Sequence, residues 1–180
     1  MTNVLLSPWE TPFDLPPFDR IDDEDFAPAL ETALIEHNAE VAAIVANPEE
    51  PDFENTIAAL EGSGAALEKV LAPFFALAGA DATPRRQELQ RQFSPKLAKH
   101  FADISGNAAL YRRIRAVWDR RDDLDLDAAD ARQLFLVHRG YVRAGAALTG
   151  AQADRMKQIK ERLAVLGTEF TQNLLKDESD

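Results

Sequence analysis

The stretch Pro51-Asp-Phe-Glu-Asn-Thr-Ile-Ala-Ala-Leu-Glu-Gly-Ser-Gly64, which continues to Leu77, carries the clearest structural pattern in this sequence. An exposed proline turn comes first, and Asn55 or Thr56 can then cap the free N–H groups at the start of a helix. Apolar residues follow at helical spacing: Ile57, Leu60, Leu67, Leu71 and Phe74. This pattern predicts one long amphipathic helix through the whole stretch.

Three residues are unusual inside that predicted helix. Gly62 and Gly64 each cost about 1 kcal/mol relative to alanine in a helix interior. We interpret them as positions that permit the close approach of a neighbouring helix. Pro73 lacks the N–H that a helix interior needs, so it predicts a kink or a split.

Helical spacing recurs along the rest of the chain, and no Asn-Gly pair, Asp-Gly pair or sustained alternating run indicates strands. Residues that can open a helix precede each apolar stripe: one of Asp22, Asp23 and Asp25, then Thr83-Pro84, Asn107, Asp127, and Thr149 with Gln152. The stripes are Phe26, Leu30, Leu34, His37, Val41 and Ile44; Leu89, Phe93, Leu97, Phe101 and Ile104; Leu110, Ile114, Val117 and Trp118; Leu134, His138, Tyr141, Val142 and Leu148; and Met156, Ile159, Leu163, Leu166, Phe170 and Leu174. Ser94-Pro95 predicts a kink or a fresh start in the second of them. We therefore expect an all-α fold, an antiparallel bundle of about six helices over residues 22–176.

The two ends of the chain carry different patterns. Pro8, Pro12, Pro16 and Pro17 disfavour a helix, so residues 1–21 are predicted to form an extended, proline-rich arm. We expect this arm to pack on the helical body by burying its large apolar side chains, which are Trp9, Phe13, Leu15, Phe18 and Ile21. A proline-rich ligand for another protein is the alternative. The last stripe predicts a helix from Gly150 to about Lys176, on the order of 40 Å long, which makes residues 177–180 look like a truncated end.

Composition limits the possible functions. The chain has 180 residues, 46% of them hydrophobic, and no cysteine, which excludes disulfides, thiol nucleophiles and thiolate metal sites. A net charge of -11 disfavours nucleic acid as a partner. The densest basic group is interspersed with aspartates and is interpreted as a solvated, ion-paired helix face: Arg112, Arg113, Arg115, Arg120 and Arg121. The apolar run from Val70 to Ala80 is too short to span a bilayer and no signal peptide is evident, so we expect a cytoplasmic protein without membrane contact.

The three histidines are the obvious candidates for chemistry, and none of them matches a catalytic motif. His37 precedes Glu40 by three residues and His100 precedes Asp103 likewise, so each pair can share a helix face. A third ligand is missing from both, and we interpret His37 as a core or boundary residue, with a metal-binding bundle that uses His37 and Glu40 as the alternative. His138 has no carboxylate at ligand spacing. H-E-x-x-H and G-x-S-x-G are absent, so we assign no catalytic, cofactor-binding or metal-binding residue.

Four stretches of this sequence resemble the N-terminal region of a family of zinc peptidases, in the order in which that family has them. They are Pro16-Pro-Phe-Asp-Arg-Ile21 with Phe26-Ala-Pro-Ala-Leu30; Asp52-Phe-Glu-Asn-Thr-Ile57 with Leu60-Glu61 and Ser63-Gly64; Ser94-Pro-Lys-Leu97 with His100; and Arg143-Ala-Gly-Ala-Ala-Leu148 with Leu166 to Asn173. The family contains thimet oligopeptidase, oligopeptidase A and peptidyl-dipeptidase, and the similarity is greatest to the bacterial peptidyl-dipeptidase branch.

The resemblance implies a non-catalytic role for these residues. Members of the family are several times longer, and their zinc-binding H-E-x-x-H lies far beyond the region matched here. The N-terminal helices of the family form one wall of a deep channel that admits short peptides. The implied partners are therefore the missing C-terminal catalytic part of the same chain and short peptide substrates, with zinc as the cofactor of the full-length protein. A stand-alone helical protein-interaction module is the alternative.

Overall fold

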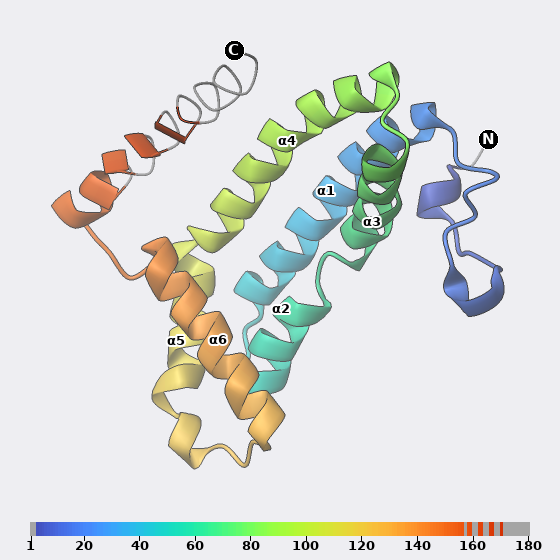
Figure 1. The fold of residues 1–180 in the computed structure, drawn as a ribbon. Coiled ribbons are helices and arrows are strands. Elements are labelled where there is room, and N and C mark those ends of the chain that lie inside the picture. The colour runs from blue at the N-terminus through green and yellow to red at the C-terminus, as the bar shows by residue number, and fades with distance from the viewer. Residues whose placement is uncertain (1–2, 157, 160–161, 164–165, 168–169, 171–180) are drawn as a thin grey trace.

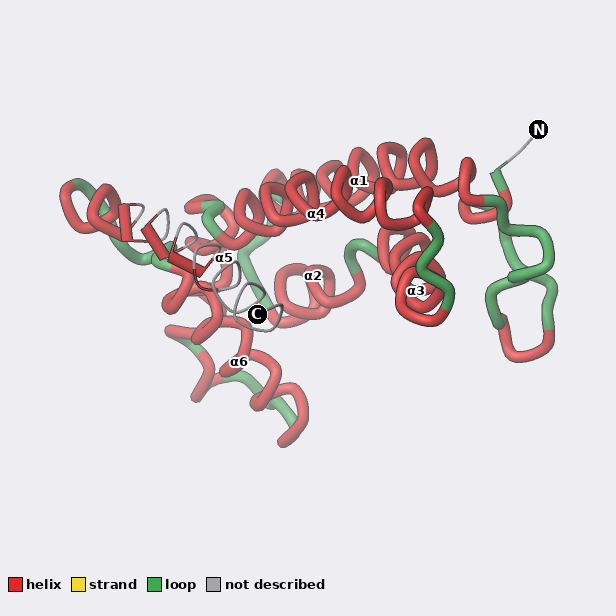
Figure 2. Tube along the Cα trace, turned by 45° about the horizontal axis from the view of Figure 1, so that its top comes forward, coloured by secondary structure: helices red, strands yellow, loops and turns green. Residues whose placement is uncertain are grey.

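The computed structural model describes residues 3–156, 158–159, 162–163, 166–167 and 170, and every regular element within these residues is a helix (Figures 1 and 2). The six α-helices of this part of the chain are α1 (Asp23–Ala46), α2 (Ala59–Gly62), α3 (Ala65–Ala80), α4 (Pro84–Ser105), α5 (Ala108–Asp119) and α6 (Ala128–Ala144). A π-helical segment, η3 (Phe53–Ala58), leads into α2, and short 3-10 turns lie at η1 (Val4–Leu6), η2 (Pro12–Asp14) and η4 (Arg121–Asp123). The prediction of an all-α fold with about six helices is confirmed.

The helices form an elongated body (Figure 1). Helix α1 runs down the view, α2 and α3 return beside it, and α4 runs down again along α1. Helix α5 continues from the lower end of α4, and α6 returns against it. The chain is helical again over residues 151–156, on a segment that projects from the body. None of the described helices is long and apolar enough to cross a membrane.

Two separate hydrophobic cores hold this body together. The first lies between the N-terminal half of α1, α3 and α4, and its largest fully buried side chains are Leu5, Phe26, Leu30, Phe74, Leu89 and Phe93. The second lies between the C-terminal end of α1, η3, α5 and α6, around Ile57, Leu110, Ile114, Val117 and Leu134. Helix α1 has 24 residues and is therefore about 36 Å long, which is enough to contribute to both cores.

The predicted single helix after Pro51 is wrong in two respects. It begins earlier, because Asp52 and not Asn55 or Thr56 is the cap: the Asp52 carboxylate accepts the Asn55 N–H at 2.7 Å, and the Asn55 side chain accepts the Asp52 N–H at 3.1 Å. It is also broken, because Ser63 is extended (ψ 152°) and Gly64 is left-handed (φ 78°) between α2 and α3. A left-handed residue cannot continue an α-helix, so the chain changes direction there.

The internal prolines do not divide their helices. Pro73 lies within α3, and Pro95 lies within α4, which runs on to Ser105. Of the two alternatives at each position, the split at Pro73 and the fresh start at Pro95 are therefore wrong, and the kink stays a prediction. Pro73 is buried with the neighbouring Phe74, and burial of these side chains offsets the helix bond that proline removes. The predicted caps at Thr83, Asn107 and Asp127 are confirmed, since each side chain accepts backbone N–H groups at the start of its helix.

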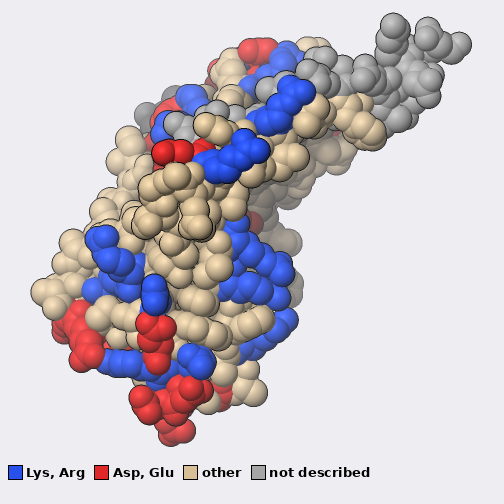
Figure 3. All heavy atoms as spheres, turned by 90° about the vertical axis from the view of Figure 1, so that its left-hand side faces the viewer, with Lys and Arg blue, Asp and Glu red and all other residues tan. Residues whose placement is uncertain are grey.

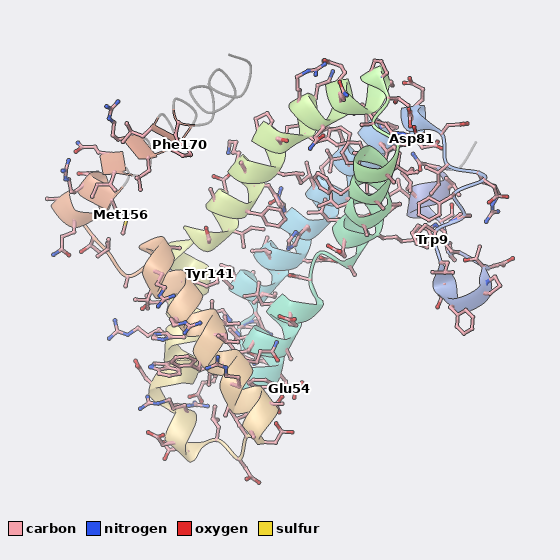
Figure 4. All side chains as sticks on the ribbon, in the orientation of Figure 1. Trp9, Glu54, Asp81, Tyr141, Met156 and Phe170 are labelled. Atoms are coloured by element: carbon pink, nitrogen blue, oxygen red, sulfur yellow. The ribbon has the colours of Figure 1, made fainter. Side chains whose placement is uncertain are left out.

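The N-terminal arm packs on the helical body through fewer side chains than expected. Ile21 is buried, and Trp9 connects the arm to α3, because the Lys69 ammonium of α3 is 4.6 Å from the centroid of the Trp9 ring (Figure 4). Phe13, Leu15 and Phe18 are exposed, so the expectation that they are buried is wrong. A residue without an expected role, Leu5, is completely buried instead. In α4, Phe101 is likewise exposed, and the adjacent His100 takes the inward position.

Candidate functional site

Two of the three candidate histidines meet at the junction between the two cores. His37 projects from the middle of α1 and His100 from α4, and both side chains are buried, with 8% and 6% of their surface exposed. The distance between His37 Nδ1 and His100 Nε2 is 3.0 Å, a hydrogen bond between the two rings. The sequence associated each histidine with a carboxylate on its own helix, whereas the structure pairs the histidines with each other.

The break between α2 and α3 encloses the other side of the His37 ring. His37 Nε2 lies 3.3 Å from the Ser63 hydroxyl oxygen, and the Ser63 hydroxyl donates to the backbone carbonyl of Leu60 at 2.7 Å. The Gly64 N–H donates to the Glu40 carboxylate at 2.7 Å. A Cβ added at Gly64 would lie only 2.9 to 3.1 Å from three atoms of the His37 ring. The interpretation of Gly64 as a position of close approach is therefore confirmed.

The second glycine of that stretch is different. A Cβ added at Gly62 would have no atom within 4 Å. Gly62 thus permits no close approach, and the expectation for this residue is wrong. The spacing of the two glycines did not distinguish them, because the difference lies in the left-handed backbone of Gly64 and in the His37 ring that α1 places against it.

Burial sets the charge state of the histidine pair. Burial lowers the pKa of His37 below the ordinary value of 6.5, and the Glu40 carboxylate partly opposes this. Burial also lowers the pKa of His100, with a second lowering contribution from a charge on His37 and an opposing one from Asp103. Both rings are accordingly neutral near pH 7.

A cavity of about 430 Å³ lies over the break between α2 and α3. It is lined by His37, the break itself, apolar residues of α3 and two carboxylates, Glu61 and Glu68. Since the Ser63 proton is donated to a main-chain carbonyl, this hydroxyl is not activated by the neighbouring imidazole, and the arrangement does not resemble a serine nucleophile with its base. The described residues contain no group of three or more histidine, aspartate or glutamate side chains that could hold a metal ion.

His138 belongs to a separate aromatic stack in the second core. Its ring lies parallel to that of Trp118, with centroids 4.5 Å apart and planes within 2°. The Arg121 guanidinium lies 4.6 Å from the centroid of the Trp118 ring. Burial lowers the pKa of His138 as well. These contacts are those of a packed stack between α5 and α6.

The basic group on α5 and in the turn that follows it is only partly the solvated face that was predicted. Three of its members form exposed ion pairs, Arg115 with Asp119, Arg120 with Glu50, and Arg121 with Asp122. Arg113 is buried and contradicts the prediction: it donates to the Asn47 carbonyl and to the Asn55 side chain, each at 2.8 Å. Its spacing from Leu110 and Val117 places it on the apolar stripe, which is the signal that identifies it.

Charge is distributed unevenly along the chain. All but two of its 20 lysine and arginine residues, Arg20 and Lys69, follow residue 84. Figure 3 shows lysine and arginine side chains gathered on the face of the molecule that lies to the left in Figure 1. The acidic excess of the chain therefore belongs to its first half.

The fold and the histidine cluster define a helical scaffold in which the described residues form no recognisable catalytic centre. No family model matches the chain. Its sequence is 40% identical to the dipeptidyl carboxypeptidase of Escherichia coli (strain K12), over 96% of this chain and 25% of that protein. The dipeptidyl carboxypeptidase of Salmonella typhimurium is also 40% identical, over 97% of this chain and 26% of that protein. Oligopeptidase A of E. coli is 28% identical over 97% of this chain and 25% of its own length.

The resemblance to peptidyl-dipeptidase and oligopeptidase A is confirmed by these comparisons over nearly the whole chain. The chain spans about a quarter of the length of the curated relatives it matches, and the matched quarter is N-terminal.

Proposed function

We propose that this chain is the non-catalytic N-terminal helical part of a zinc-dependent oligopeptidase of the peptidyl-dipeptidase type. One observation carries the proposal: 96% of the chain matches a dipeptidyl carboxypeptidase at 40% identity while it covers 25% of that protein. In this proposal the catalytic residues and the zinc ligands belong to the remaining, C-terminal part of the longer chain. Short peptides are its substrates, and the cytoplasm is its location.

An exposed apolar stripe supports a larger partner for this chain. Figure 4 shows Met156 and Phe170 on the projecting segment. Beyond Met156, this segment exposes Ile159, Leu163, Leu166 and Phe170, at 40%, 61%, 42% and 69% of their surface. Steps of four, three and four place these side chains on one helical face. An apolar face of this kind is covered in a stable assembly, and the C-terminal part of the same chain is the partner that we propose.

The stripe makes a measurable prediction for the 180-residue chain by itself. It should bind a hydrophobic dye or self-associate, and replacement of Leu163 by glutamate should reduce both effects. Gln158→Glu, in which the substituted residue is exposed on the same segment but adjacent to Ile159 in sequence and so on another side of the helix, is the matched control. A compact monomer in light scattering, with no dye binding, would count against the proposal that the C-terminal part of the chain covers this stripe.

The reading frame beyond codon 180 is the decisive test of the proposed function. We expect an in-frame H-E-x-x-H several hundred codons downstream, and zinc-dependent release of dipeptides from blocked peptides by the longer protein. The 180-residue chain should cleave no peptide, with or without zinc. A stop codon directly after codon 180 would favour a stand-alone interaction module, and robust zinc-dependent cleavage by the pure 180-residue chain would contradict the proposed division of roles.

The proposed contribution to a substrate channel needs its own experiment. A peptide substrate that carries a photo-activated cross-linker, bound to the longer protein, should label residues within the first 180. Excess unlabelled peptide should compete for the labelling. Labelling confined to the C-terminal part would refute a channel wall made by these helices.

A further inference from the structure

The hydrogen bonds around His37 define where its protons lie. The Ser63 hydroxyl has one proton and donates it to the Leu60 carbonyl, so its oxygen accepts from His37 Nε2. Neutral His37 then has its lone pair on Nδ1, which accepts a hydrogen bond from His100 Nε2 at 3.0 Å. A continuous chain of hydrogen bonds therefore runs from α4 through α1 to the break between α2 and α3.

The hydrogen-bonded pair of His37 and His100 tolerates one added proton but not two. With one proton added, either ring is charged and the other still offers a lone pair to the shared N–H. With two, both facing nitrogens are donors, and two positive charges oppose each other across a 3.0 Å contact. The pair then has to separate.

The surrounding charged groups only partly compensate a second positive charge. Glu40 on α1 faces His37 but also accepts the Gly64 N–H, and Asp103 on α4 faces His100 but is paired with Lys99. From α2 and α3, Glu61 and Glu68 line the cavity beside His37. Neither of these two carboxylates is within hydrogen-bonding distance of a ring among the contacts described for the histidines.

We propose that the His37–His100 pair is a pH-sensitive latch, which seats the break between α2 and α3 on α1 and α4 and opens when the pair takes up a second proton. Opening of the pair has a structural consequence because the two histidines lie where the two hydrophobic cores meet. When the rings separate, the hydrogen bond between His37 and Ser63 is lost, and the His37 ring no longer covers Gly64. The latch is a property of this helical part itself and does not depend on the proposed peptidase role.

Hydrogen exchange measured with pH tests the latch. Between about pH 6.5 and pH 5, the amides of Ser63, Gly64 and Glu68, which are hydrogen-bonded in the folded chain, should lose protection by about tenfold per pH unit after correction for intrinsic rates, since the open state binds one more proton. In the same range, ¹⁵N shifts of the two imidazoles should titrate in two coupled steps. His100→Gln, which replaces the Nε2–H by an uncharged amide donor, should reduce this pH dependence, because only the buried His37 ring is then left to take up a proton. His138→Gln, which alters a histidine outside the pair, should leave it unchanged.

Three results would overturn the proposal. The first is equal protection of these amides at both ends of the pH range, and the second is retention of the full pH dependence in His100→Gln. The third is binding of one equivalent of added Zn²⁺ by both imidazoles, because the pair would then be a metal site. The imidazole titration needs only the unmodified chain, so it decides the matter if His100→Gln does not fold.

Discussion

Replacement of Gly64 by alanine is the most direct test of how the break between α2 and α3 is built. Two independent penalties arise from one methyl group. The backbone of Gly64 has φ 78°, a conformation that costs an alanine about 1 to 2 kcal/mol. The new Cβ would also lie 2.9 to 3.1 Å from the His37 ring, which is bonded on both of its nitrogens and cannot move freely.

The expected loss of stability follows from these contacts. Displacement of the ring weakens its hydrogen bonds to Ser63 and His100, each worth about 1 kcal/mol. The lower entropy of an unfolded alanine returns about 0.4 to 1 kcal/mol. We therefore expect Gly64→Ala to reduce the free energy of unfolding by about 2 to 3 kcal/mol. The slope of the unfolding free energy with urea should not change, because the folded and unfolded surfaces stay the same.

Gly62→Ala is the matched control, two residues away. Its Cβ would meet nothing within 4 Å, and the residue is helical, so this change should be neutral or stabilise by up to about 1 kcal/mol. Gly64→Asn separates the backbone penalty from the steric one. Asparagine tolerates the left-handed conformation and so avoids most of the backbone penalty, but its Cβ still lies against His37. Equilibrium urea unfolding measures all three. The reasoning is refuted if Gly64→Ala and Gly62→Ala have equal effects.

Three further predictions concern burial and charge. Arg113→Met should destabilise by about 2 to 4 kcal/mol, because it removes the charged hydrogen bonds that the buried guanidinium donates to the Asn47 carbonyl and the Asn55 side chain. Arg112→Met, at an exposed site, should change stability by less than about 0.5 kcal/mol in the same urea experiment. Leu5→Ala should cost about 2 to 5 kcal/mol and Phe13→Ala less than about 0.5 kcal/mol, which thermal unfolding distinguishes; similar values would refute the docking of the arm through Leu5. Burial lowers the pKa of all three histidines in the folded chain, so the unfolded chain binds protons first as pH falls, and stability should be full above pH 6.5 and decline below it. Stability that is constant from pH 7.5 to pH 5 would contradict those pKa directions.

Local features of the fold were predictable where short segments determine them. Thr83, Asn107 and Asp127 cap the helices that their positions indicated, because a cap bonds only to N–H groups two or three residues away. The apolar stripes of α1 and α5 were likewise correct, apart from the buried guanidinium of Arg113. Exposure of Phe13 and burial of Leu5 were not predictable, since hydrophobicity alone does not indicate which side chain of an arm meets a core.

The histidine cluster shows the limit of the same method. Each histidine was recognised as a candidate, and the inward position of His37 followed from its place on the stripe of α1. Its bonded partner, however, is 63 residues away on α4. Sequence spacing brings together only residues within a turn or two, so it associated each ring with Glu40 or Asp103 and missed the pair.

By itself, the sequence determined that the chain is helical, where most of its helices begin, and that it resembles the N-terminal part of larger peptidases. These properties rest on hydrogen bonds and periodicities within single segments, and on motifs that follow one another in order. Only the tertiary structure showed that the stretch after Pro51 is broken at Gly64, where α1 places the His37 ring so close that a Cβ would not fit. Packing between distant helices, and not local preference, also decided that two cores form and that a histidine pair joins them.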